Sequence, residues 1–185
     1  MDKILDSGTE NWLQAVSARQ QVETLLRCNE ASAAYGLVLS QADCALLLAE
    51  RQRVLKQERR VELGRSILPE LVRTFCASPY LSQDNYVETL LRLQEIFFCY
   101  KNEMLDEISD GELLQFMQEQ FDTVCFGDLD YLEGTCLDIF AQAIRAGYRG
   151  QQRTAGRDEF TRLDIVTRWD RQLYLQVLQE LTGWR

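Results

Sequence analysis

The stretch from Arg59 to Glu103 constrains the fold more than any other part of the chain. It contains two runs of apolar residues, and in each run they recur at spacings of one, three and four residues, which places them on one side of an α-helix. A segment containing Ser78-Pro79 separates the runs, and proline forces an extended backbone on the residue before it. The pattern predicts a helical hairpin over residues 66–102, with its elbow at Ser78-Pro79, at the centre of a hydrophobic core.

The same helical spacing recurs along the rest of the chain, and no segment alternates apolar and polar residues for long enough to form a strand. We therefore predict an all-α protein, a single-domain bundle of about seven helices. Residues 29–39 are expected to be a connector. The predicted helices are about Glu10–Cys28, Ser40–Gln57, Ser66–Ala77, Gln83–Asn102, a helix from the Ser109 cap through Phe121, Leu129–Ala146 and Asp158–Leu181.

Several helix starts are marked by polar residues that can bond the free backbone N–H groups of a first turn. Ser109-Asp110-Gly111-Glu112 is a complete capping box, and Ser40 with Asp43 forms a variant of the same pattern. Ser66 and Ser82 are expected to cap the two helices of the hairpin. In domain terms, we expect a helical core domain over residues 1–148, a polar linker at 149–157 and a C-terminal helix within 158–185 that packs on the core.

Charge is unevenly distributed along a chain whose formal net charge is −9. Eleven acidic residues and no Lys or Arg lie between Asn102 and Ile144, whereas residues 145–171 contain seven arginines and four acids. The two segments could pair with each other or be solvated, the acidic one could face a partner, or it could hold a divalent cation. The net charge argues against nucleic-acid binding, although a weaker hypothesis assigns it to a local basic group: Arg51, Arg53, Lys56, Arg59 and Arg60.

The complete absence of histidine excludes every catalytic arrangement that depends on an imidazole base or ligand. The six cysteines form no Cys-x-x-Cys pair, so we expect reduced core residues and neither a metal nor a cofactor. The N-terminus has no apolar secretory core, and no apolar run approaches the length of a membrane span. These features predict a cytoplasmic protein that does not enter a membrane.

The polar ends and the elbow of the hairpin are the candidate binding positions. In an antiparallel hairpin the two outer ends lie close together, so charged residues at those ends could form either a salt-bridge latch or a binding pocket. Two tyrosines stand at the elbow. The candidate residues are Arg60, Glu62, Tyr80, Tyr86, Lys101 and Glu103.

Several short motifs are distributed over the middle of the chain. They are Tyr35-Gly36-Leu37, Arg60-Val61-Glu62, Phe75-Cys76-Ala77-Ser78-Pro79-Tyr80, Asn85-Tyr86, Phe97-Phe98-Cys99-Tyr100-Lys101-Asn102-Glu103 and Ser109-Asp110-Gly111-Glu112-Leu113. Together these motifs resemble an uncharacterised family of anaerobic Gram-positive bacteria, a domain of unknown function. The resemblance covers about residues 33–148 and implies a bacterial, cytosolic setting, with no activity, cofactor or catalytic residue to carry over.

Taken together, these features predict a non-enzymatic protein-interaction or adaptor module, acting on a protein partner or as a homo-oligomer. The alternative is an enzyme or small-ligand-binding protein with a pocket near the Ser78-Pro79 elbow or the Arg60/Glu103 end of the hairpin.

Overall fold

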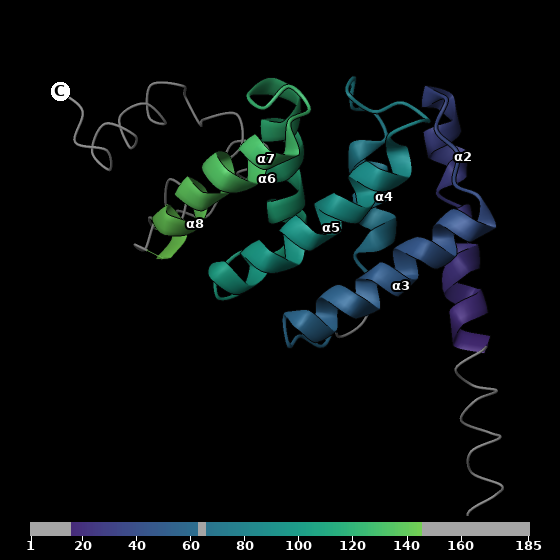
Figure 1. Cartoon of the computed structure of the whole chain (residues 1–185), viewed down its shortest axis with the longest axis horizontal. Coiled ribbons are helices and arrows are strands. Elements are labelled where there is room, and N and C mark those ends of the chain that lie inside the picture. The colour runs from purple at the N-terminus through teal and green to yellow at the C-terminus, as the bar shows by residue number, and fades with distance from the viewer. Residues whose placement is uncertain (1–15, 63–65, 146–185) are drawn as a thin grey trace, which may run out of the picture. The chain divides into compact units, whose positions relative to one another are not determined.

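The computed structural model describes residues 16–62 and 66–145 (Figure 1). Every regular element in these residues is a helix, which confirms the all-α prediction. Six of the seven predicted helices lie at least partly in these residues, and helix is observed in all six; residues 10–15, the start of the first, lie outside the described residues. The predicted linker at 149–157 and the C-terminal helix lie outside the described residues. The chain divides into two compact units, with the boundary between Cys99 and Tyr100, inside helix α5 (Tyr86–Glu103).

Unit 1 is built from short and medium helices in chain order. A helix over residues 16–26 is followed by α2 (Asn29–Ser32), the 3-10 turn η1 (Ala33–Tyr35), α3 (Gln41–Gln57), α4 (Leu68–Phe75) and most of α5. The expected connector at 29–39 was therefore wrong in its first half. A turn at residues 27 and 28 interrupts the helix only briefly, and Gly36, with a φ of 75°, ends the helical path.

The local caps show where sequence signals succeed and where they fail. Ser40 and Asp43 form the predicted reciprocal capping box at the start of α3. Ser82 does not begin α5, because the Asn85 side chain accepts a bond from the Ser82 N–H at 2.8 Å and donates one to the Tyr80 carbonyl at 3.0 Å. These two bonds hold residues 80–85 in a loop, so α5 begins three residues later than predicted. At the start of α4 the Ser66 hydroxyl accepts a bond of 3.3 Å from the Leu68 N–H, although Ile67 and not Ser66 occupies the N-cap position.

Residues 37–39 form an extended bridge that is held by two amide side chains. Asn29 exchanges two hydrogen bonds of 2.8 Å with the backbone N–H and carbonyl of Leu39. Gln83 bonds the backbone of Val38 in the same way, at 2.8 and 3.0 Å. The amides thus satisfy polar groups that a neighbouring strand would satisfy in a sheet. This lets Leu37 and Leu39 enter the core while Val38 stays exposed.

Replacing Asn29 with alanine is expected to lower the free energy of unfolding by about 1–3 kcal/mol, because it removes both partners of the buried Leu39 backbone. Gln52→Ala is the matched control, since Gln52 is exposed on α3 and its loss is expected to cost no more than about 0.5 kcal/mol. Urea denaturation followed by circular dichroism measures both. Equal effects in the two variants would show that water replaces the Asn29 amide without cost.

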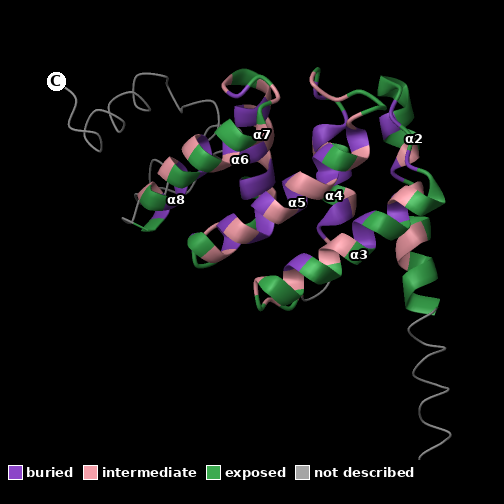
Figure 2. Cartoon of the chain, in the orientation of Figure 1, coloured by how far each residue is buried: buried purple, intermediate pink, exposed green. Residues whose placement is uncertain are grey.

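The core of unit 1 lies along α4 and the first part of α5. Figure 2 shows buried residues concentrated on these helices, whereas α3 is buried on one side only. Leu68, Leu71, Val72 and Phe75 of α4 are fully buried. Their spacing is the one that the sequence pattern identified, so both helices of the predicted hairpin are observed with their apolar residues inside.

Unit 2 contains the last residues of α5, then α6 (Asp110–Thr123), α7 (Leu129–Tyr131), a π-helical segment η2 (Leu132–Leu137) and α8 (Asp138–Arg145). Ser109 and Glu112 form the predicted capping box of α6. The rings of Phe116 and Phe140 stack with centroids 3.9 Å apart and join α6 to α8. The sequence predicted one regular helix from Leu129 onward, and the π-helical segment inside it was not foreseen.

Candidate functional site

Glu62 joins two elements of unit 1. Its carboxylate accepts a hydrogen bond from the Arg51 Nε at 2.5 Å and another from the Ile67 backbone N–H at 2.6 Å. The Arg51 and Glu62 side chains are only 13% and 11% exposed. Arg60 lies half-buried just beyond α3, and its backbone N–H donates to the Leu55 carbonyl at 2.8 Å. Both Glu62 oxygens therefore have protein partners, and the residue acts as a structural link between α3 and the start of α4.

Lys101 closes the loop between α5 and α6 in unit 2. Its ammonium group, on a side chain 6% exposed, donates to the Ile108 carbonyl at 2.6 Å and lies 2.9 Å from an Asp110 oxygen. Asp106 supplies a second carboxylate at 3.4 Å. Glu103, by contrast, is exposed and accepts a bond of 2.6 Å from Arg145. The sequence analysis placed Lys101 and Glu103 close to Arg60 and Glu62. Because the two pairs belong to different units, this contact stays a prediction.

The two tyrosines of the elbow have different environments. Tyr80 is half-buried, and its loop is closed by the Asn85 bond described above. Tyr86 is completely buried, and its hydroxyl has no hydrogen-bond partner. Burial raises the pKa of Tyr86 to about 12, and the nearby Ser32 hydroxyl opposes this rise without reaching hydrogen-bond geometry. Tyr86 is thus a core residue, and a small-ligand pocket at the elbow stays a prediction.

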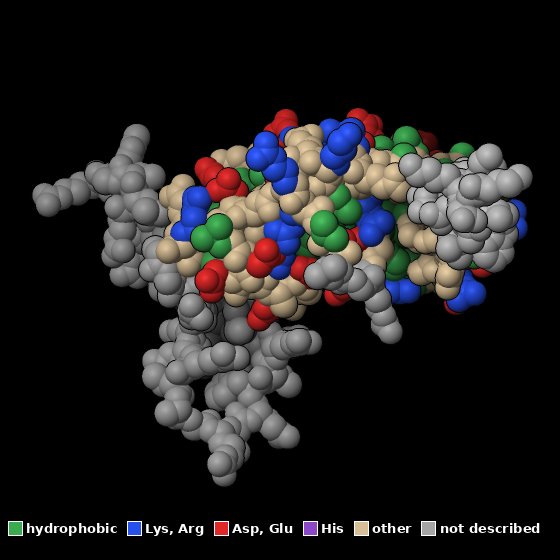
Figure 3. All heavy atoms as spheres, turned by 90° about the horizontal axis from the view of Figure 1, so that it is seen from below, with side chains coloured by type: hydrophobic (Ala, Val, Ile, Leu, Met, Phe, Trp, Pro, Cys, Tyr) green, Lys and Arg blue, Asp and Glu red, His purple; other side chains and the backbone are tan. Residues whose placement is uncertain are grey.

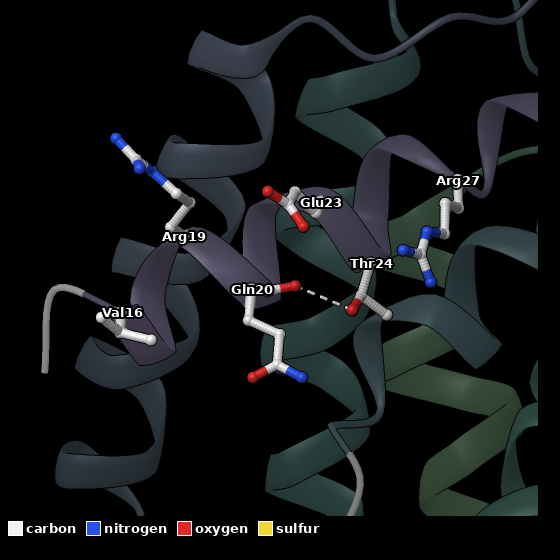
Figure 4. Close-up of a pocket in the computed structure, with 6 residues that line it drawn as sticks. All are labelled: Val16, Arg19, Gln20, Glu23, Thr24 and Arg27. Carbon is white, nitrogen blue, oxygen red and sulfur yellow. Dashed lines mark hydrogen bonds between the residues drawn. The ribbon is translucent and has the colours of Figure 1, made fainter. Parts of the chain in front are cut away.

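A shallow hollow of about 330 Å³ lies against the first helix (Figure 4). Its lining residues come from one face of that helix, and the bond from the Thr24 hydroxyl to the Gln20 carbonyl at 2.8 Å is local. Sites for small molecules are concave and mostly apolar, with a few convergent polar groups. This hollow is open and polar, so it does not have the character of such a site. Its lining residues are Val16, Arg19, Gln20, Glu23, Thr24 and Arg27.

Carboxylates outnumber cations among the described residues of unit 2, which are residues 100–145. Residues 100–145 contain eleven acids but only two cations, Lys101 and Arg145. Lys101 is buried against its partners and Arg145 is paired with Glu103. We call the carboxylates of this unit the acidic surface: Glu103, Asp106, Glu107, Asp110, Glu112, Asp128, Asp130 and Asp138 are exposed, and Glu119, Asp122 and Glu133 are half-buried. Partial burial raises the pKa of Glu119.

Two aromatic side chains project from the acidic surface. Phe126 is 67% exposed and Tyr131 is 43% exposed. Phe126 has a φ of 51° and Gly127 one of 86°, so the turn between α6 and α7 contains two left-handed residues directly before Asp128, which caps α7. A left-handed conformation is costly for a bulky residue, and such costs concentrate at functional positions. The sequence analysis placed residues 126 and 127 between two predicted helices and did not single out Phe126. The signal it missed was an aromatic residue, rather than a small polar one, directly before the glycine.

Two arginines of the hypothesised basic group are paired with carboxylates. Arg51 pairs with Glu62, and Arg53 pairs with Glu50 and Glu95. On the face shown in Figure 3, acidic and basic side chains lie near one another and hydrophobic side chains form separate patches. Within the described residues, no three Cys, Asp or Glu side chains are arranged to hold a metal ion. None of the helices described is long and apolar enough to cross a membrane.

The profile of DUF6323, a family of unknown function, matches residues 24–150 of the chain. This range includes residues 33–148, over which the motif resemblance was noted. Comparison with curated proteins and with solved structures finds no match.

Proposed function

The chain belongs to DUF6323, a family of unknown function, and we propose that it is a non-enzymatic protein-interaction module. The acidic surface with its exposed Phe126 and Tyr131 carries this proposal. Its occupant is a protein segment that is rich in Lys or Arg and also presents apolar side chains. The bacterial, cytoplasmic setting belongs to the same proposal, and six free cysteines are consistent with it.

The chemistry of the surface supports a division of roles between charge and aromatic contact. An excess of carboxylates attracts a basic segment over several ångströms and speeds association, but it adds little affinity once salt screens it. Exposed aromatic rings supply the affinity, because burying them on a partner removes a large apolar area from water. Phe126 and Tyr131 stand five positions apart on the turn and helix that follow α6, so one segment of a partner could contact both.

Affinity capture with the full-length chain tests this function. The double variant Phe126→Ser/Tyr131→Ser is expected to bind the partner at least ~30-fold more weakly than the wild type, since truncating interface aromatics costs about 1 kcal/mol or more at each. The matched control is Tyr35→Ser, which removes an aromatic side chain that is 57% exposed in unit 1. This control is expected to capture the same protein in the same amount as the wild type.

Capture is also expected to weaken as ionic strength rises, because the attraction between the acidic surface and a basic segment is screened. Sedimentation of the purified chain distinguishes a foreign partner from a second copy. If the double variant and Tyr35→Ser lose the captured protein equally, the binding surface lies elsewhere. A wild-type chain that captures nothing and sediments as a monomer would contradict the proposal as a whole.

A further inference from the structure

Two cysteine thiols meet in the interior of unit 2. The sulfur atoms of Cys125 and Cys136 are 3.6 Å apart, and the residues are 5% and 1% exposed. Of the remaining cysteines, Cys28 and Cys76 direct their thiols to backbone carbonyls. Cys125 and Cys136 are separated by eleven positions and follow no recognised motif, so only the fold brings them together.

Each sulfur is positioned by an irregular piece of backbone. Cys125 directly precedes the two left-handed residues Phe126 and Gly127, and its N–H reaches back to the Gln120 carbonyl at 2.8 Å. Cys136 lies in the π-helical segment η2, whose Glu133 carbonyl accepts a hydrogen bond from the Tyr100 hydroxyl. Both π-helical turns and left-handed residues are uncommon and cluster at functional positions. Here two such features converge on one sulfur–sulfur contact.

We propose that Cys125 and Cys136 form a peroxide-reactive dithiol that closes to an intramolecular disulfide. One thiol loses its proton, and the thiolate attacks an oxygen of hydrogen peroxide. The O–O bond breaks, a sulfenic acid forms, and the leaving hydroxide takes up the released proton to become water. The second sulfur then attacks the sulfenic sulfur, an S–S bond forms, the S–O bond breaks, and the hydroxide leaves as water with the proton of the second thiol. Two thiols lose two electrons and two protons, and one peroxide becomes two waters.

The geometry favours the second of these steps. The partner sulfur has to approach by only about 1.6 Å to reach the S–S bond length of about 2.05 Å. A nucleophile held at such a distance reacts as if it were at a very high concentration, so the sulfenic acid is captured before a second peroxide reaches it. The first step is slow at neutral pH, because the hydrogen bond to Cys136 and burial raise the pKa of Cys125. The reaction is therefore expected to accelerate as the pH rises from 7 to 9.

The test uses the full-length, fully reduced chain and a small molar excess of hydrogen peroxide. After quenching, alkylation under denaturing conditions is expected to label four of the six thiols of the treated protein and all six of the untreated one. Digestion without reductant is expected to give one cross-linked peptide pair that joins Cys125 to Cys136. The control variant Cys99→Ser, which removes the half-buried thiol, is expected to give the same pair.

Two results would overturn the proposal. One is a wild-type protein in which all six thiols can still be alkylated although peroxide has already oxidised its methionines, which shows that the oxidant was active. The other is a disulfide population in which a different pair dominates. Both readouts come from the wild-type chain, so they do not depend on the folding of a cysteine variant. Cys136→Ser is a supporting variant, and circular dichroism checks its fold: it is expected to lose the cross-link and to accumulate the sulfinic acid of Cys125 instead.

Discussion

Replacing Glu62 with alanine is expected to lower the free energy of unfolding by about 3–5 kcal/mol, the cost of removing one partner of a buried ion pair. Arg51 would keep its charge on a side chain that is 13% exposed, with no carboxylate to accept its Nε–H. The Ile67 N–H, which donates to Glu62 at 2.6 Å, would lose its acceptor as well. The loss would therefore act on α3 and on the start of α4 together.

Three further variants separate charge from hydrogen bonding. Glu62→Gln keeps an acceptor for Ile67 and is expected to fall between the wild type and Glu62→Ala. The double variant Arg51→Met/Glu62→Leu removes both charges and is expected to be more stable than Glu62→Ala, because no unpaired ion remains. Glu23→Ala, at an exposed carboxylate of the first helix, is the control and is expected to change stability by no more than about 0.5 kcal/mol. A Glu62→Ala protein as stable as this control would show that Glu62 is not a structural link.

Raising the pH from 8 to 12 is expected to remove about 5 kcal/mol of stability or more. Burial, followed by the neighbouring charge of Asp43, raises the pKa of Cys44 from 9.0 to about 11. Burial likewise raises the pKa of Tyr86 from 10.0 to about 12. Each of these rises corresponds to roughly 2–3 kcal/mol. Together they approach the whole stability of an ordinary domain.

The folded chain holds the protons of the Cys44 thiol and the Tyr86 hydroxyl more tightly than the unfolded chain does, and this determines the sign of the pH dependence. Both groups are neutral when protonated, and the folded chain keeps them protonated to a higher pH than the unfolded chain does. Their contribution is thus fully present below pH 9 and is lost as the pH rises through 11 and 12. Burial also raises the pKa of the Cys28 and Cys76 thiols, so these residues add to the loss in the same direction.

Urea denaturation at a series of pH values measures this loss, and Tyr86→Phe tests its origin. At pH 8 the variant is expected to be as stable as the wild type or more stable, because the hydroxyl it removes has no partner. Between pH 10 and 12 it is expected to lose about 2 kcal/mol less than the wild type. If wild type and variant lose stability along the same curve, the Tyr86 hydroxyl ionises as freely in the folded chain as in the unfolded one.

The sequence predicted those features whose partners are close in the chain. The capping boxes at Ser40 and Ser109 were predicted correctly, because both members lie within one helical turn. The hairpin helices were predicted from the periodicity of their apolar residues. The start of α5 was missed, because the side chain of Asn85 competes with the helix for its own loop. Helix type and core side were thus predictable, whereas helix ends depended on individual side chains.

Features that depend on distant residues could not be predicted from the sequence. The order of residues in the chain does not predict that Arg51 pairs with Glu62. The sequence analysis instead named Glu62 as a candidate binding residue. Nothing pairs Cys125 with Cys136 either, and the π-helical segment that positions the second sulfur has no local signal. The excess of acidic residues between Asn102 and Ile144 could be read directly from the sequence. Its combination with an exposed Phe126 emerged only from the backbone conformation at the end of α6.

Zero-length cross-linking of the captured complex shows whether the acidic surface of unit 2 binds a basic protein segment. A carbodiimide joins carboxylates to lysines in direct contact, and mass spectrometry identifies the linked residues. We predict that the cross-links of this chain concentrate between residues 119 and 138, on either side of Phe126 and Tyr131. Cross-links that instead come mainly from exposed acids of unit 1, such as Glu23, Glu30 and Glu88, would contradict the account.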